Sequence, residues 1–249
     1  MSRVNQHNRF YRNLIRRSDL VSFRVAVKET DLFVQADKNL EGLARDLVLQ
    51  CRAYIETYAK NNPLFLKTLR PWRVNGPAPL IIRNMARAGQ MAGVGPMASV
   101  AGAISEYVGK GLLPHTDEIV IENGGDVFVK TKSSFTVGIY AGASPLSLRM
   151  GIRIDGENKP ISVCTSSGKI GHSLSLGKAD AVCVVSRSCP LADAAATATA
   201  NRVHSKSDIP KAIGFAKAIE GVSGLVVIVD DEIGLWGQLE VVPLTLKKG

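Results

Sequence analysis

Residues 164–201, CTSSGKIGHSLSLGKADAVCVVSRSCPLADAAATATAN, contain a polar turn, an apolar strand and an alanine-rich segment in immediate succession. The turn is rich in Ser and Gly. A Cys-Pro pair separates the strand from the last segment, whose Ala and Leu content favours a helix. Polar residues at the end of one strand, followed by an acid early in the next helix, are typical of a binding site.

Asp193 and Thr197 lie four residues apart on the predicted helix, so their side chains share one face, one turn apart. A carboxylate and a hydroxyl there can hold a hard cation such as Mg²⁺, which keeps water or substrate phosphates at its other positions. The alternative is structural. Asp193 can complement the positive end of the helix, while Thr197 bonds back to a carbonyl of the preceding turn.

The polar turn comes directly after the apolar strand that ends at Cys164. Its hydroxyls and backbone N–H groups can bind an anion, and they belong to Thr165, Ser166, Ser167 and Gly168. His172 follows closely and is the usual type of proton acceptor at neutral pH. The alternative is a solvated histidine in a Ser/Gly loop.

The composition indicates a globular protein that binds acidic partners. The chain has 249 residues, 45% of them hydrophobic, which is enough for a sizeable core. Its formal charge of +9 favours acidic partners such as a nucleotide phosphate, a nucleic acid or an acidic protein. Part of the excess is local, and residues 1–18 are expected to form a mobile basic arm with Arg3, Arg9, Arg12, Arg16 and Arg17.

No stretch approaches eighteen uninterrupted apolar residues, and the N-terminus has no signal-like apolar region, so a soluble, cytoplasmic protein is expected. Four cysteines show no metal-finger spacing, which favours reduced thiols. Cys51 and Cys183 are expected to pack in the core. Cys164 and Cys189 have two interpretations. Each is either a small buried hydrophobe or a reactive thiol, because Cys189 precedes a helix N-terminus that would stabilise a thiolate.

The first half of the chain predicts a hairpin and three helices. Two Val- and Phe-rich runs form the hairpin, residues 20–28 and 32–35. Apolar residues then recur at helical spacing over 39–59, with Asp37 as the expected N-cap. A second helix covers 80–91, and Pro96 suits the first turn of a third. An irregular, proline-rich crossing connects the first two helices.

The second half predicts strands, because the apolar period changes to two. Residues 118–122 and 126–130 form a hairpin around an Asn-Gly turn. Helices are expected at 191–203 and 209–220. Further strands are expected at 135–141, 146–154, 160–164, 181–186, 224–230 and 235–242. The pattern predicts one α+β domain over residues 1–249, in which mostly antiparallel sheets pack against helices.

Three motifs in register resemble the ApbE superfamily of flavin transferases, over roughly residues 91–242. They are Asn123-Gly124-Gly125-Asp126, Thr165-Ser166-Ser167-Gly168 with the nearby His172, and Ala192-Asp-Ala-Ala-Ala-Thr197. The resemblance is closest to an uncharacterised cytoplasmic branch, and it implies an ApbE-like, T-fold-like architecture. The chain departs from the family at Ser99-Val100, where a Lys-Gly pair is usual, and over residues 173–180.

The resemblance implies a cofactor set and residue roles. In the characterised family, FAD is split with Mg²⁺ and its FMN half is placed on an acceptor hydroxyl or released by hydrolysis. Asp193 and Thr197 match the metal ligands, and His172 matches the proposed base. The turn 123–126 and the loop 165–168 match the flavin-nucleotide site, and a backbone carbonyl near Pro96 matches a further metal contact.

The implied activity is Mg-dependent binding of FAD or FMN, by an FMN transferase or an FAD pyrophosphatase if the chain is an enzyme. Its partners would be a flavin nucleotide or another phosphate-bearing small molecule and an acceptor protein, with a homo-oligomer left open. One alternative is an accessory protein of sulfide incorporation and homocysteine synthesis that uses Cys164 or Cys189. Another is a non-catalytic basic binding module. Nucleic-acid binding ranks last, because no known reader motif accompanies the basic residues.

Overall fold

A computed structural model describes residues 17, 19–168 and 176–244. Its largest element is an antiparallel sheet of eight strands in the order β1-β2-β3-β4-β7-β8-β9-β10. A second sheet has the order β11-β6-β5. The strands are β1 (Val21–Val27), β2 (Thr30–Ala36), β3 (Ile119–Asn123), β4 (Asp126–Lys130), β5 (Phe135–Gly138), β6 (Met150–Ile154), β7 (Ile161–Ser166), β8 (Ala181–Ser186), β9 (Val222–Val229), β10 (Glu232–Gly237) and β11 (Glu240–Pro243).

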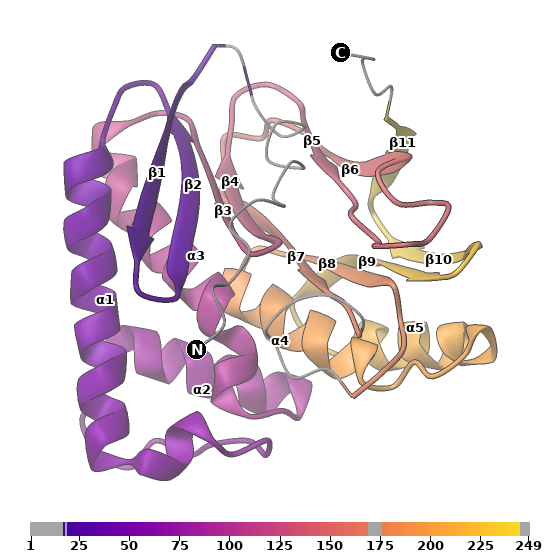
Figure 1. Ribbon diagram of the computed structural model, residues 1–249, viewed down its shortest axis with the longest axis horizontal. Helices are drawn as coiled ribbons and strands as arrows, with labels where there is room; N and C mark the ends of the chain where they lie inside the picture. Colours follow the sequence, from indigo (N-terminus) through magenta and orange to yellow (C-terminus); the bar gives the residue numbers. More distant parts are fainter. Residues whose placement is uncertain (1–16, 18, 169–175, 245–249) are drawn as a thin grey trace.

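The helices cover one face of the large sheet, and the small sheet lies against the other (Figure 1). They are α1 (Glu41–Asn61), α2 (Leu80–Ala92), α3 (Val100–Leu112), α4 (Cys189–Ala200) and α5 (Ile209–Lys217), with 3-10 turns η2 (Pro63–Leu66), η3 (Pro96–Ser99), η4 (Leu113–His115) and η5 (Lys206–Asp208). The expected α+β class with mostly antiparallel sheets is therefore confirmed. No helix in the described ranges is long and apolar enough to cross a membrane.

The central strands are buried on both faces, which explains their continuous apolar sequences. On β4, Phe128 packs with the helices, whereas Val127 and Val129 pack with the small sheet. On β8, Val184 faces the helices and Cys183 faces the small sheet. Alternation along each strand thus divides the molecule into two cores that share the large sheet.

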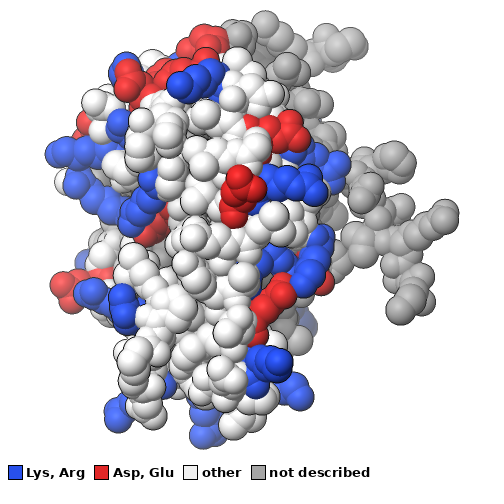
Figure 2. Space-filling model, turned by 90° about the vertical axis from the view of Figure 1, so that its left-hand side faces the viewer, with Lys and Arg blue, Asp and Glu red and all other residues white. Residues whose placement is uncertain are grey.

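Helix α1 lies at the outside of the helical layer, and its solvent face is seen in Figure 2. It begins at Glu41, where Leu40 occupies the N-cap position without a side-chain bond. The prediction that Asp37 caps this helix is wrong. The Asp37 carboxylate instead accepts bonds from the Thr116 hydroxyl and from the backbone N–H groups of Asp117 and Glu118.

Two further predicted elements differ from the structure. The helix expected from Pro96 starts as the 3-10 turn η3 and becomes α-helical only at Val100. The strand expected over 235–242 is two strands, β10 and β11, which belong to different sheets. Gly237 is the last residue of β10 and has φ of 100°, and a Cβ there would meet the Ser223 carbonyl oxygen at 2.2 Å. A positive φ and this close approach permit only glycine.

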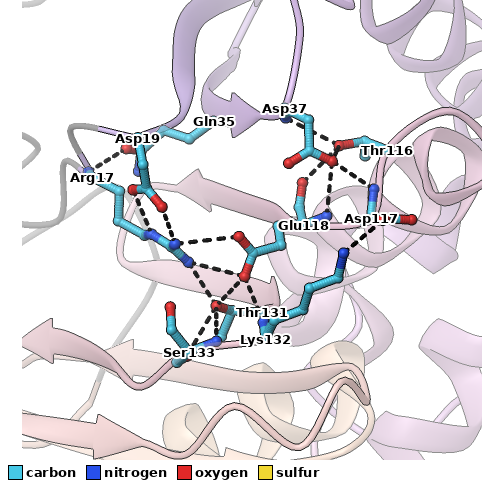
Figure 3. A network of polar contacts seen from close by, with 10 residues as sticks. All are labelled: Arg17, Asp19, Gln35, Asp37, Thr116, Asp117, Glu118, Thr131, Lys132 and Ser133. Carbon is cyan, nitrogen blue, oxygen red and sulfur yellow. Dashed lines mark hydrogen bonds and ion pairs between the residues drawn. The ribbon is translucent and has the colours of Figure 1, made fainter.

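A polar network joins the start of the described chain to β2, β3 and β4 (Figure 3). The Arg17 guanidinium bonds to both oxygens of Glu118 at 3.2 Å and to the Thr131 hydroxyl at 2.6 Å. Glu118 also accepts the backbone N–H of Lys132. Arg17 was expected within the mobile arm, and the structure fixes it to the sheet instead; residues 1–16 and 18 lie outside the described ranges.

Candidate functional site

Asp193 lies where α4 meets the start of α3. Its Oδ2 accepts the backbone N–H of Gly102 at 2.9 Å, one of the N–H groups that have no partner within α3. A Cβ on Gly102 would lie 2.5 Å from the Cys189 carbonyl oxygen and 2.9 Å from the Asp193 Cβ. The two helices are therefore in direct contact here, and the positive end of α3 is directed at the Asp193 carboxylate.

A second carboxylate, that of Asp126, interacts with Asp193. Asp126 is the first residue of β4 and pairs with Cys164 on β7. Burial raises the pKa of Asp126 well above its usual range, and the charges of Asp193 and Glu122 raise it further. Burial also raises the pKa of Asp193 to about 7, against the lowering effect of bonds with Gly102, Ala101 and Asp126. The two acids therefore oppose each other's ionisation, and a cation between them would relieve that opposition.

The turn between β3 and β4 is tied to α3. Asn123 donates its side-chain N–H to the Ala101 carbonyl oxygen at 3.1 Å, and Gly125 donates its N–H to Glu122 at 2.9 Å. The φ values of Gly124 and Gly125 are 67° and 107°. A Cβ on Gly125 would lie 3.5 Å from the Thr165 carbonyl oxygen. The structure thus brings the predicted turn against the end of β7, where the predicted loop begins.

The loop residues do not all face the acid pair. The Thr165 hydroxyl donates to the Cys183 sulfur at 3.2 Å, on the face opposite Cys164, whereas a backbone bond involving Thr165 reaches Asp126. The Gly168 N–H donates to the Ala179 carbonyl oxygen at 2.9 Å, so in this structure that N–H is already engaged. Ser166 is buried and Ser167 is partly buried. His172 lies outside the described residues.

The donors at this site fit a hard divalent cation. Asp193 is partly exposed, and Thr197 follows one turn later on the same face of α4. Together with Asp126 they offer carboxylate and hydroxyl oxygens, which suit Mg²⁺ and leave room in its coordination shell for water or phosphate. Within the described ranges, no cluster of three or more His, Cys, Asp or Glu residues could form an all-protein cage.

Cys164 and Cys189 are adjacent and buried. Their sulfur atoms lie 3.6 Å apart, and neither residue is exposed. Burial raises the pKa of both thiols, and the neighbouring Cys189 raises that of Cys164 further. Of the two interpretations, the small buried hydrophobe therefore fits this structure better than the reactive thiol, because desolvation outweighs the helix dipole. Burial likewise raises the pKa of Cys51 and of Cys183 to about 12.

Glu106 is a site-supporting residue that the sequence analysis missed. Its buried carboxylate accepts the Cys189 N–H at 2.7 Å and pairs with Lys110. It therefore occupies the N-terminus of α4, where a negative charge is stabilising. The available signal was that Glu106 is the only acid between residues 57 and 116. Glu106 also lines a cavity of about 310 Å³ that none of Asp126, Asp193 and Thr197 lines. The donor chemistry, and not the size of a cavity, therefore marks the candidate site.

Comparisons with known proteins show both relatives and a shared fold. The family model described as AbpE bacteria matches residues 12–230. A UPF0280 protein of Methanococcus aeolicus is 39% identical over 226 residues, covering 88% of this chain and 91% of the relative. A UPF0280 protein of Methanocaldococcus jannaschii is 41% identical over 222 residues, covering 87% and 90%.

Solved structures of flavin transferases resemble this chain in fold. The flavin transferase ApbE from Vibrio cholerae has a TM-score of 0.56 at 12% sequence identity, covering 87% of this chain and 96% of that one. The apo form of the Pseudomonas stutzeri flavinyl transferase ApbE has a TM-score of 0.54 at 12% identity, covering 90% and 94%. At this level of identity the likeness concerns the fold alone.

Proposed function

The chain belongs to the family described as AbpE bacteria, and on that premise we propose that it binds a flavin nucleotide together with Mg²⁺. The observation that carries the proposal is the acid pair of Asp126 and Asp193. Two neighbouring carboxylates whose pKa values are raised by burial are stabilised as anions when a cation binds between them. A nucleotide diphosphate binds together with such a cation, usually Mg²⁺. The fold shared with flavin transferases supports a flavin as the nucleotide.

In this proposal Asp193 and Thr197 hold the metal ion, and Asp126 adds negative charge beside it. Mg²⁺ would neutralise the charge on the phosphate oxygens and orient the diphosphate. The turn 123–126 and the loop 165–168 border the flavin nucleotide. Gly125 has no Cβ, so a phosphate or ring can approach its backbone closely.

The proposed reaction is a phosphoryl transfer from FAD. The oxygen of an acceptor hydroxyl, or of water, bonds to the phosphorus of the FMN half while the bond from that phosphorus to the bridging oxygen breaks. AMP leaves with that oxygen, and the proton of the hydroxyl passes to His172 as the base. A protein acceptor would make the chain an FMN transferase, and water would make it an FAD pyrophosphatase.

The test measures metal binding and turnover separately. Calorimetry with MgCl₂ should show binding that Asp193→Asn weakens at least about tenfold, which is about 1.4 kcal/mol. Asp46→Asn, on the exposed face of α1, is the matched control and should leave binding unchanged. Purified protein with FAD and Mg²⁺ should release FMN and AMP, as followed by chromatography, and His172→Ala should abolish the release. Equal Mg²⁺ affinity in wild type and Asp193→Asn would contradict the ligand assignment.

The sulfur-handling alternative has no support from the two cysteines. A nucleophilic thiol must be accessible and ionise near neutral pH. Cys164 and Cys189 are buried, and burial raises both pKa values. The flavin proposal therefore stands as the function that the geometry supports best. A cytoplasmic location stays a prediction.

A further inference from the structure

A long part of the helical layer carries positive charge only. Residues 57–105 contain no Asp or Glu, and their six cations are Lys60, Lys67, Arg70, Arg73, Arg83 and Arg87. The segment includes the end of α1, η2 and α2, at the lower end of the molecule in Figure 1. At the lower end of the face in Figure 2, Lys and Arg surround uncharged residues without Asp or Glu between them. The local potential there is positive.

Exposed leucines lie among these cations. Leu64 is 66% exposed, Leu66 is 48% exposed and Leu69 is 59% exposed. Lys67, Arg70 and Arg73 in the same segment are also exposed. We call residues 63–73 the leucine platform. Single exposed apolar residues are common on monomers, but several of them together mark interaction surfaces.

The leucine platform is held rigidly although η2 is its only helical part and residues 67–73 contain no helix or strand. Phe65 is fully buried, and its ring packs edge-to-face on Tyr58 at 5.0 Å and on Trp72 at 5.9 Å. The Trp72 indole N–H donates to the Tyr58 hydroxyl at 3.0 Å, and Gln90 donates to the Trp72 carbonyl oxygen at 2.6 Å. A surface already fixed in place loses little conformational entropy when it binds.

The platform also contacts the segment that leads into α3. A Cβ on Gly95 would lie 1.9 Å from the Thr68 carbonyl oxygen, so these two backbones touch. Gly95 directly precedes η3, which leads into α3 and to the Gly102 N–H that binds Asp193. A partner bound on the platform would therefore contact residues that pack against a segment continuous with the candidate site.

We propose that the leucine platform is a docking surface for a polypeptide that carries acidic residues around aliphatic or aromatic ones. The apolar side chains would cover Leu64, Leu66 and Leu69, and the carboxylates would pair with the surrounding cations. An apolar centre with a charged rim and fixed aromatic support is the usual composition of a protein interface. The proposal does not depend on the flavin function.

Three other occupants fit less well. A second copy packed symmetrically would bring the same cations opposite one another, which is repulsive. Nucleic acid pairs with the cations but leaves the leucines without a partner. A membrane surface is bound through long amphipathic helices or through clusters of four or more basic residues, whereas η2 has four residues and the platform has three cations. Charge and rigidity together favour the acidic polypeptide.

The test uses a fluorescent peptide that alternates Asp and Glu with Leu and Phe. Two control peptides replace either the acids by Asn and Gln or the apolar residues by Ser. Binding is followed by anisotropy without flavin or Mg²⁺, so that its failure is distinct from failure of the flavin proposal. The platform variants are Leu64→Ser with Leu66→Ser, and Arg70→Glu with Arg73→Glu. The matched controls are Leu49→Ser on α1 and Lys211→Glu on α5, both exposed and outside the platform.

We expect the acidic-apolar peptide to bind more tightly than either control peptide. Each platform variant should raise its Kd at least about tenfold, and the matched controls should change it less than about twofold. Equal binding by platform and control variants would overturn the proposal. So would tighter, platform-dependent binding to phosphatidylglycerol vesicles or to a single-stranded oligonucleotide, or a platform-dependent dimer in sedimentation.

Discussion

At the scale of single residues, the buried carboxyl group of Asp126 is expected to destabilise the metal-free protein. It is buried, and the charge of Asp193 opposes its ionisation. We expect Asp126→Asn to raise the free energy of unfolding of the metal-free protein at pH 8, because the unfolded chain ionises this acid more readily than the buried site does. The same change should weaken Mg²⁺ binding. Urea denaturation and calorimetry measure the two effects, and a variant that is less stable without metal would contradict the argument.

The two glycines of the β3–β4 turn offer a matched pair of substitutions. Gly124 has φ of 67°, which Asn tolerates, whereas Gly125 at 107° lies where only glycine is comfortable. We expect Gly125→Val to lose flavin affinity at least about tenfold and to cost about 1–3 kcal/mol in backbone strain. Gly124→Asn should keep most of the flavin affinity and most of the stability. A folded Gly125→Val protein with full FAD affinity would make the turn purely structural.

The thiols of Cys164 and Cys189 give a prediction about reactivity. Both are buried, with pKa values raised by burial, so the native protein should resist a thiol reagent between pH 7 and pH 9. Labelling should appear only on unfolding, when all four cysteines become accessible. Mass spectrometry of the labelled protein measures this directly. Rapid native labelling of either cysteine would revive the sulfur-handling alternative.

Sequence spacing identifies some site residues and not their contacts. Asp193 and Thr197 could be assigned to one helical face because both lie on one short segment. The interaction between Asp126 and Asp193 could not be predicted from the sequence. It depends on the pairing of β4 with β7 and on how α4 packs against these strands. For the same reason Asp37 was assigned to the nearest helix, whereas its partners Thr116 and Glu118 lie far along the chain.

At the scale of elements, the packing of α3 against α4 should be disrupted by the addition of one methyl group at their contact. Gly102→Ala places a Cβ against the Cys189 backbone and Asp193, and we expect it to destabilise the protein by about 1–3 kcal/mol. It should also weaken Mg²⁺ binding by displacing Asp193. Gly214→Ala is the matched control, because its Cβ would meet nothing within 4 Å in the exposed middle of α5. That control should gain up to about 1 kcal/mol. Equal melting temperatures for the two variants would contradict a tight contact.

Most elements were predictable because local pattern and tertiary packing agree. The period-two runs became β1, β4 and β8, and the apolar stripe became α1. The failures occur where tertiary packing decides. The stretch after residue 235 reads as one strand, yet it divides at Gly237 because each half pairs with a different sheet.

At the scale of the whole molecule, the Arg17–Glu118 network should make stability depend on pH (Figure 3). Burial of Glu118 acts to raise its pKa, but bonds from Lys132, Thr131 and Arg17 outweigh it and lower the pKa below the usual range. A lowered folded-state pKa stabilises the protein above the unfolded value of about 4.3. That contribution is lost as the pH falls through the folded-state pKa.

Glu118→Gln should therefore cost about 2–3 kcal/mol at pH 7, since it removes the negative charge beside Arg17 and replaces one of the two acceptor oxygens by a donating amide. The difference from wild type should shrink below pH 4. Glu29→Gln is the control, because Glu29 pairs with Arg52 at an exposed position and should cost less than about 1 kcal/mol. Denaturation curves across pH measure both variants. A Glu118→Gln deficit that is constant from pH 7 to pH 3 would contradict the titration argument.

The pairing of β11 with β6 determines when the small sheet can form during synthesis. β6 ends at Ile154 and β11 begins only at Glu240, so the small sheet is a bare hairpin until β11 leaves the ribosome. A lone two-stranded hairpin is marginal in water. The apolar face of β4, β7, β8 and β9 that this sheet covers would stay incompletely covered in the nascent chain until β11 emerges. Chaperone demand should therefore peak late, and it should concern this face and not the helical layer, most of which has by then been made.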